Sequence, residues 1–124
     1  MWIFQTSDEI CAQRARREFV ALLRSRGRKA HYYDEEIIFG ELLGNVARHS
    51  PGPVNIWVDW EDGDAILYVH DYGPAFYPRR ENASIDIEHG RGLALVRALA
   101  SEVQINRVPI KGNEVIARFR VDAA

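Results

Sequence analysis

The chain has 124 residues, of which 47% are hydrophobic and 27% charged, and this is the size and composition of one ordinary globular domain. A formal net charge of -2 excludes a basic field of the kind that recruits nucleic acid or anionic lipid. The single cysteine, Cys11, excludes an internal disulfide, and no apolar run reaches the roughly 20 residues of a membrane span. We therefore expect one cytoplasmic domain over residues 1–124, with no direct contact to nucleic acid or membrane.

The N-terminal segment predicts a short strand followed by a helix. Residues 2–5 are aromatic and apolar, which is typical of an edge strand. Thr6 and Glu9 have the spacing of a capping box, so we expect a helix that runs to about Ser25 and is capped by Gly27. The residues expected to face the protein core from this helix are Ile10, Ala15, Phe19, Leu22 and Leu23.

A second helix and a hairpin are expected next. The helix begins near Asp34, where an apolar stripe at helical spacing starts, and ends at Ser50-Pro51-Gly52-Pro53. Segments 54–60 and 65–71 alternate between apolar and polar residues on either side of the turn 61–64, which predicts an antiparallel hairpin. The apolar stripe of the helix consists of Ile37, Ile38, Leu42, Leu43 and Val46.

The rest of the chain predicts a long loop, a third helix and a second hairpin. Residues 72–89 show little periodicity, and a loop of this length is usually functional. A helix is expected to start at residues 90–92, and a final hairpin to pair 103–107 with 114–121. Strands and helices do not alternate as repeated βαβ units. We therefore expect an α+β two-layer sandwich, a mixed and mainly antiparallel sheet with about three helices on one face.

Glu41, Asn45 and His49 form the first candidate site. They are spaced four residues apart, so they line one stripe of the second expected helix. A carboxylate and an amide one turn apart can hold a cation through oxygen atoms, or orient a water or a hydroxyl group. An ordinary polar helix face explains the same spacing, so this pattern alone leaves both interpretations open.

The second candidate site is Asp71-Tyr72-Gly73, where an apolar strand stops at an aspartate. A carboxylate at a strand end can accept a hydrogen bond from an exocyclic amine such as that of adenine. The glycine would let a flat ring approach the backbone. An Asp-x-Gly turn that simply closes a strand is the alternative.

The third candidate site is Gly90-Arg91-Gly92, which opens the third expected helix. Free backbone N–H groups at a helix start, without a Cβ to block approach, suit an anion such as phosphate. The segment is not a P-loop, because no Gly-Lys-Ser or Gly-Lys-Thr follows it.

The order of these motifs resembles the GHKL superfamily, the Bergerat-fold ATP-binding domains of gyrases, heat-shock chaperones, histidine kinases and mismatch-repair ATPases. Residues 41–49 resemble its N-box, residues 71–76 its first glycine box and residues 89–96 its second. Lys111-Gly112-Asn113 stands where the family usually has Gly-Thr. Within the superfamily the chain is most similar to the single-domain anti-sigma factor serine/threonine kinases, over roughly residues 3–121.

At the phosphate end, the resemblance implies that Asn45 binds a Mg²⁺ ion that bridges the phosphates of ATP. Glu41 would be the general base, which activates a substrate hydroxyl or a water. His49, and Arg48 beside it, stand where the family often carries a basic or polar residue near the phosphates.

The two glycine boxes are implied to hold the rest of the nucleotide. Gly90 and Gly92 would offer backbone N–H groups to the phosphates and Arg91 would add charge, while residues 77–88 would form the ATP lid.

At the purine end, Asp71 would hydrogen-bond the adenine, with Gly73 beside the ring. Two positions depart from the family pattern. Ala75 replaces the second glycine of Asp-x-Gly-x-Gly, and Asn113 replaces a threonine that would support Asp71 and the adenine.

The expected function is that of an ATP- and Mg²⁺-dependent anti-sigma-type regulator. It would phosphorylate a STAS-type antagonist protein on serine and sequester a sigma factor. The sheet face away from the helices is expected to carry Trp57, Ile66 and Tyr68, which suit a homodimer or partner surface, unless a terminal segment covers them. The alternatives are a non-catalytic nucleotide-binding interaction module, a stand-alone GHKL ATPase or detached histidine-kinase-like domain, and an unrelated α/β binding protein.

Overall fold

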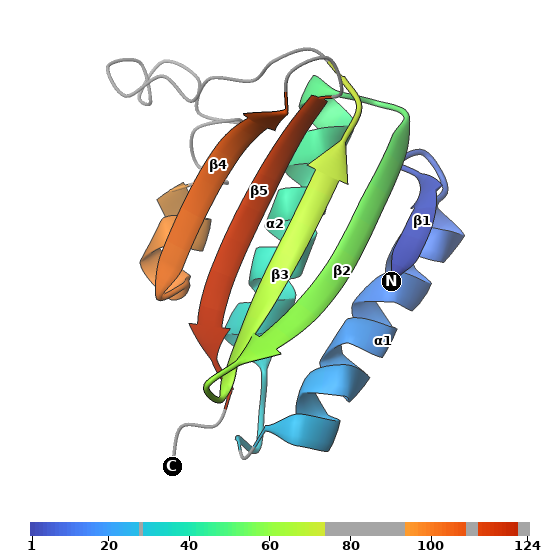
Figure 1. The fold of residues 1–124 in the computed structure, drawn as a ribbon. Coiled ribbons are helices and arrows are strands. Elements are labelled where there is room, and N and C mark those ends of the chain that lie inside the picture. Colours follow the sequence, from blue (N-terminus) through green and yellow to red (C-terminus); the bar gives the residue numbers. More distant parts are fainter. Residues whose placement is uncertain (28, 74–93, 109–111, 122–124) are drawn as a thin grey trace.

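The computed structural model describes residues 1–27, 29–73, 94–108 and 112–121 (Figure 1). In chain order its elements are β1 (Trp2–Gln5), α1 (Glu9–Arg26), α2 (Tyr33–His49), β2 (Pro53–Glu61), β3 (Asp64–Asp71), β4 (Glu102–Val108) and β5 (Gly112–Arg120). Residues 94–99 form a further helical segment between β3 and β4. The first two predicted helices and both hairpins are confirmed, and the third helix is confirmed over residues 94–99.

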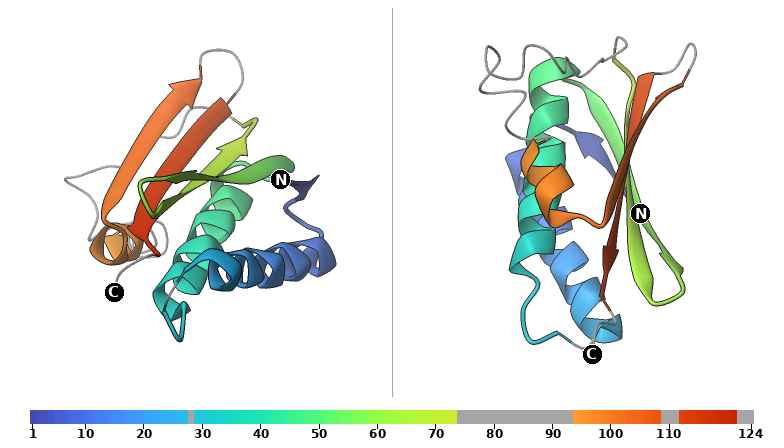
Figure 2. Two further views of the ribbon diagram at one scale, coloured as in Figure 1. Left: turned by 60° about the horizontal axis from the view of Figure 1, so that its bottom comes forward. Right: turned by 90° about the vertical axis from the view of Figure 1, so that its left-hand side faces the viewer.

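The strands form one five-stranded sheet in the order β1-β2-β3-β5-β4. Each neighbouring pair of these strands is antiparallel. The sheet seen edge-on in Figure 2 has α1, α2 and residues 94–99 on the same side. The predicted α+β two-layer sandwich is therefore confirmed, and the sheet is antiparallel throughout its described strands. No helix in the described part of the chain is long and apolar enough to cross a membrane.

The turn between β2 and β3 sets the register of the central hairpin. Asp62 and Gly63 both have positive φ angles, 51° and 81°, which is the backbone of a two-residue type I′ turn. This turn matches the right-handed twist of the strands and pairs Val58 with Leu67 and, further along, Val54 with Asp71. Asp71 is thereby brought to the last position of β3.

The core lies between the sheet and the helices. Phe19 of α1 stacks on Phe39 of α2 with ring centroids 5.0 Å apart, and Phe119 of β5 meets Phe19 edge-on at 6.0 Å. Burying one such side chain stabilises the fold by about 1.5–3 kcal/mol. Leu42 and Val46 of α2 belong to the same core. They fix one face of α2 against the sheet and so determine where the neighbouring polar residues of this helix lie.

The start of α1 differs from the prediction. Its N-cap is Asp8, whose side chain accepts a hydrogen bond of 3.0 Å from the backbone N–H of Cys11. This bond favours the charged carboxylate and lowers the pKa of Asp8. Thr6 is instead hydrogen-bonded to Gly52, the residue before β2, because its N–H donates to the Gly52 carbonyl and its Oγ1 accepts from the Gly52 N–H. The predicted capping box between Thr6 and Glu9 was therefore wrong.

One predicted core residue of α1 is also wrong. Ala15, Phe19 and Leu23 are buried and Leu22 is half-buried, but the side chain of Ile10 is 74% exposed. At 100° per residue, Ile10 lies about 140° around the helix from Ala15, so it faces away from the sheet.

Gly40 offers a test of how much helix propensity contributes to α2. A Cβ built on Gly40 would meet no neighbouring atom closer than Arg16 Nη1, at 4.0 Å. Gly40→Ala should therefore raise the free energy of unfolding by about 0.5–1 kcal/mol, because alanine loses less backbone entropy in a helix. Urea denaturation measures this change, and an unchanged or lower midpoint would contradict it.

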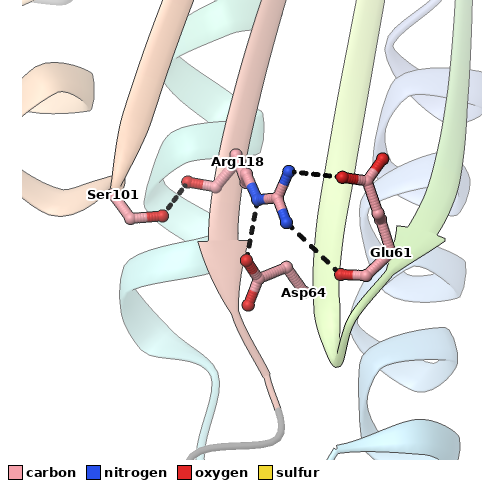
Figure 3. A network of polar contacts seen from close by, with 4 residues as sticks. All are labelled: Glu61, Asp64, Ser101 and Arg118. Atoms are coloured by element: carbon pink, nitrogen blue, oxygen red, sulfur yellow. Dashed lines mark hydrogen bonds and ion pairs between the residues drawn. The ribbon is translucent and has the colours of Figure 1, made fainter.

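The sheet face opposite the helices carries a polar network and an aromatic pair. Arg118 Nε donates to Asp64 Oδ2 at 2.7 Å and Arg118 Nη1 donates to Glu61 Oε1 at 3.1 Å (Figure 3). These bonds raise the pKa of Arg118 above its ordinary value. Trp57 and Tyr68 stack beside them with ring centroids 5.0 Å apart. This face is therefore partly apolar, as the alternation of β2 and β3 predicted.

Candidate functional site

The polar stripe of α2 supplies one side of the site. Glu41, Asn45 and His49 occupy successive turns of the helix, because residues four apart share a helix face. Glu41 and His49 are half-buried and Asn45 is buried. The structure thus brings these three residues together on one element, as the sequence predicted.

Asn45 is the residue of this stripe best suited to hold a cation. Its side chain is 4% exposed, and its Oδ1 has no hydrogen-bond partner among the residues that the structure describes. An unpaired buried amide oxygen costs about 1–3 kcal/mol, and hard cations such as Mg²⁺ prefer oxygen ligands. Within the described ranges no three His, Cys, Asp or Glu side chains cluster as a metal site. A cation at Asn45 would therefore need further ligands from a bound molecule or from water.

Asp71 supplies the other side of the site, at the end of β3. Leu67, Val69 and Asp71 alternate along the strand on its buried face, so the carboxylate continues a row of core residues. It is 6% exposed. The C-terminal ends of β3 and α2 lie at the same end of the molecule (Figures 1 and 2). The buried carboxylate is thus on the helix-facing side of the sheet, at the end of the molecule where α2 ends.

Two donors hold the Asp71 carboxylate in place. The backbone N–H of Gly73 donates to Asp71 Oδ1 at 2.9 Å, and Asn113 Nδ2 donates to the same oxygen at 3.0 Å. Asn113 stands opposite Asp71 in the pairing of β3 with β5, and it is buried as well. Hydrogen bonds of this kind fix the orientation of a buried carboxylate. Asn113 therefore supports Asp71 directly, although asparagine stands here in place of the threonine of the family pattern.

Close backbone approaches explain the glycines around this carboxylate. A Cβ on Gly73 would overlap Ser50 Oγ, and a Cβ on Gly112 would overlap the backbone carbonyl of Asp71. Gly112 also has a φ angle of 105°, which side-chain-bearing residues rarely adopt. Both positions need glycine so that the ends of α2, β3 and β5 can meet at Asp71.

Several predicted site residues lie outside the described residues. These are Gly90, Arg91 and Gly92 of the second glycine box, Ala75, and the lid expected over residues 77–88. Their roles, and the cavity that they would share with Glu41 and Asp71, stay predictions.

Ser50 belongs to the site but was not predicted. The sequence placed it only in the Ser-Pro-Gly-Pro segment that ends α2, where serine is an ordinary choice. In the structure it is the C-cap of α2, it is 3% exposed, and it packs on Gly73. Its burial depends on a contact between residues far apart in the sequence, and no local pattern signals such a contact.

Comparison with known families agrees with this arrangement. A model of the family described as histidine kinase-like ATPase domain matches residues 5–119. The chain belongs to this family. No curated protein matches the chain significantly. Membership means that this ATPase domain binds ATP, and it confirms the resemblance to the GHKL superfamily. The closer resemblance to the anti-sigma factor kinases stays a prediction.

Proposed function

We propose that this ATPase domain is an anti-sigma-type regulator with serine-protein kinase activity. It would phosphorylate a STAS-type antagonist protein and sequester a sigma factor. The observation that carries the proposal is the pairing of a buried, oriented carboxylate, Asp71, with a buried amide oxygen that lacks a described partner, Asn45. One suits an exocyclic amine and the other a cation, which are the two ends of Mg-ATP.

Asp71 would accept a hydrogen bond from the purine. Its carboxylate is oriented by Gly73 and Asn113, so it does not have to reorganise to accept a hydrogen bond from the adenine amino group. The backbone of Gly73 has no side chain, which suits contact with a flat ring. Asparagine at position 113 performs the supporting role that threonine has in the family pattern.

Asn45 would provide a protein ligand for Mg²⁺, with the phosphates and water as the other ligands. The ion would neutralise charge on the triphosphate, which is the main requirement of phosphoryl transfer besides positioning. His49 and Arg48 follow on the next turn of α2, where a basic side chain could assist at the phosphates. The glycine-opened segment 90–92 would supply backbone N–H groups there.

Glu41 would act as the general base. It lies one turn before Asn45, so a hydroxyl group presented beside the metal end of the nucleotide would be within its reach. Its carboxylate is half-buried and therefore accessible to a second protein. A serine hydroxyl of the antagonist is the substrate that this arrangement would orient.

The sheet face opposite the helices would carry the protein–protein contact. Trp57 and Tyr68 are stacked there, and Ile66 lies beside them in β3. A partly apolar face with polar residues at its edge is typical of an interface. We propose that a second copy of the chain, or the partner protein, covers it.

The metal claim is tested by titrating ATP with and without Mg²⁺ on wild type and on Asn45→Ala. Wild type should bind ATP about tenfold more tightly with Mg²⁺ than without it. This is the order of magnitude expected for one interaction between a side chain and a charged group. Asn45→Ala should bind ATP about equally under both conditions. Asn55→Ala, in β2 on the sheet face opposite the helices, removes a hydrogen bond from Asn55 Nδ2 to Tyr72 Oη and should keep the Mg²⁺ effect, so it is the matched control. A full Mg²⁺ effect in Asn45→Ala would contradict the assignment.

The alternative functions differ in their products. A stand-alone ATPase would release free phosphate, and a detached histidine-kinase-like domain would produce phosphohistidine. A non-catalytic interaction module would bind nucleotide without transferring phosphate. Phosphoserine on an antagonist is specific to the proposed kinase.

A further inference from the structure

Ser50 is a second buried polar group that lacks a partner in the described part of the chain. Its side chain is 3% exposed, and its Oγ has no hydrogen-bond partner among those residues. The backbone N–H of Ser50 donates to the Val46 carbonyl at 2.7 Å, so the hydroxyl has no role in closing the helix. A buried hydroxyl without a partner is unfavourable, and its presence calls for a ligand or a bound water.

The position of this hydroxyl relates it to the purine end of the site. Ser50 Oγ lies where a side chain of Gly73 would be, next to the turn that holds the Asp71 carboxylate. Ser50 caps the C-terminus of α2, five residues and about 7.5 Å along the helix axis beyond Asn45. Ser50 is therefore displaced from the metal ligand toward the end of the molecule where Asp71 lies.

We propose that Ser50 is a specificity-determining residue, whose hydroxyl donates a hydrogen bond to ring nitrogen N1 of the adenine, directly or through one water. This inference rests on the proposed ATP site. Asp71 can accept from the amino group of adenine but cannot donate to the neighbouring N1, which is an acceptor. A serine hydroxyl can donate. Asp71 and Ser50 together would read two adjacent groups of the purine edge, one donor and one acceptor.

The test compares ATP with 1-deaza-ATP, in which a C–H group replaces N1, on wild type and Ser50→Ala. Calorimetry should show that wild type prefers ATP by about fivefold to tenfold, the value of one hydrogen bond in a closed site. Ser50→Ala should bind both nucleotides with the same affinity, close to that of wild type for 1-deaza-ATP. Ser101→Ala, which removes a hydroxyl that donates to the Arg118 carbonyl on an exposed edge, is the control and should keep the preference.

Stability separates this role from a structural one. Without nucleotide, Ser50→Ala should melt no lower than wild type, because the substitution removes an unpaired hydroxyl and keeps the packing on Gly73. A lower melting temperature, or an ATP preference in Ser50→Ala equal to that of wild type, would overturn the inference while leaving the ATP site intact. If wild type bound neither nucleotide, the proposed ATP site itself would be wrong.

Discussion

Glu41→Gln is expected to lower the rate of phosphate transfer to an antagonist protein by about 10²–10⁴-fold, which is the usual contribution of a general base. Glutamine keeps the shape of glutamate but cannot take the proton of the attacking hydroxyl. ATP affinity should stay within about threefold of wild type, because the carboxylate acts on the substrate hydroxyl and not on the nucleotide. Transfer of γ-labelled phosphate to a candidate STAS-type antagonist measures the rate, and acid hydrolysis of the product identifies phosphoserine.

Glu36→Gln is the matched control for this experiment. Glu36 lies in the first turn of the same helix, so its replacement removes an equal charge away from the stripe formed by Glu41 and Asn45. It should transfer phosphate at the wild-type rate. Equal rates for Glu41→Gln and wild type would exclude Glu41 as the base. If nucleotide bound but neither protein transferred phosphate, the interaction-module alternative would be favoured.

Asp71→Asn is expected to weaken the binding of both ATP and ADP by about 10- to 100-fold. Asparagine can still accept a hydrogen bond from Gly73, but its amide group adds a donor to a site that already contains the amide of Asn113 and would receive the adenine amine. Opposed or unpaired buried donors cost about 1–3 kcal/mol. ATP and ADP should lose affinity equally, because the change lies at the purine end.

Asp64→Asn makes the same substitution at the opposite end of β3. Asp64 accepts a hydrogen bond from Arg118 on the sheet face opposite the helices, so this variant should leave nucleotide affinity unchanged. Calorimetric titration of both variants gives the comparison. Equal affinities for Asp71→Asn and wild type would show that the purine is held elsewhere.

The fold was predictable because its signals are local. Alternating residues in β2 and β3 and the Asp62-Gly63 turn each reflect one element. So does the apolar stripe of α2, except that Ile37, which was predicted to belong to it, is exposed. The error at the start of α1 has the opposite origin. Threonine is a common helix-capping residue, but the hydroxyl of Thr6 accepts a hydrogen bond from the N–H of Gly52, which is far away in the sequence.

The candidate site was predictable where spacing along one element carries it. Glu41 and Asn45 share a stripe of α2, and Asp71 marks the end of a strand. The family pattern gave the support of Asp71 to a threonine at position 113, and the contact that Asn113 makes instead depends on the register of β3 with β5. The packing of Ser50 on Gly73 depends on how α2 ends against the sheet, which no local pattern contains.

A crystal structure of the protein with Mg²⁺ and a non-hydrolysable ATP analogue would locate the purine and the metal ion together. We expect the adenine amino group within hydrogen-bonding distance of the Asp71 carboxylate and Mg²⁺ bound to Asn45 Oδ1. A complex with the purine away from Asp71 and Gly73, or with the metal held without Asn45, would contradict it.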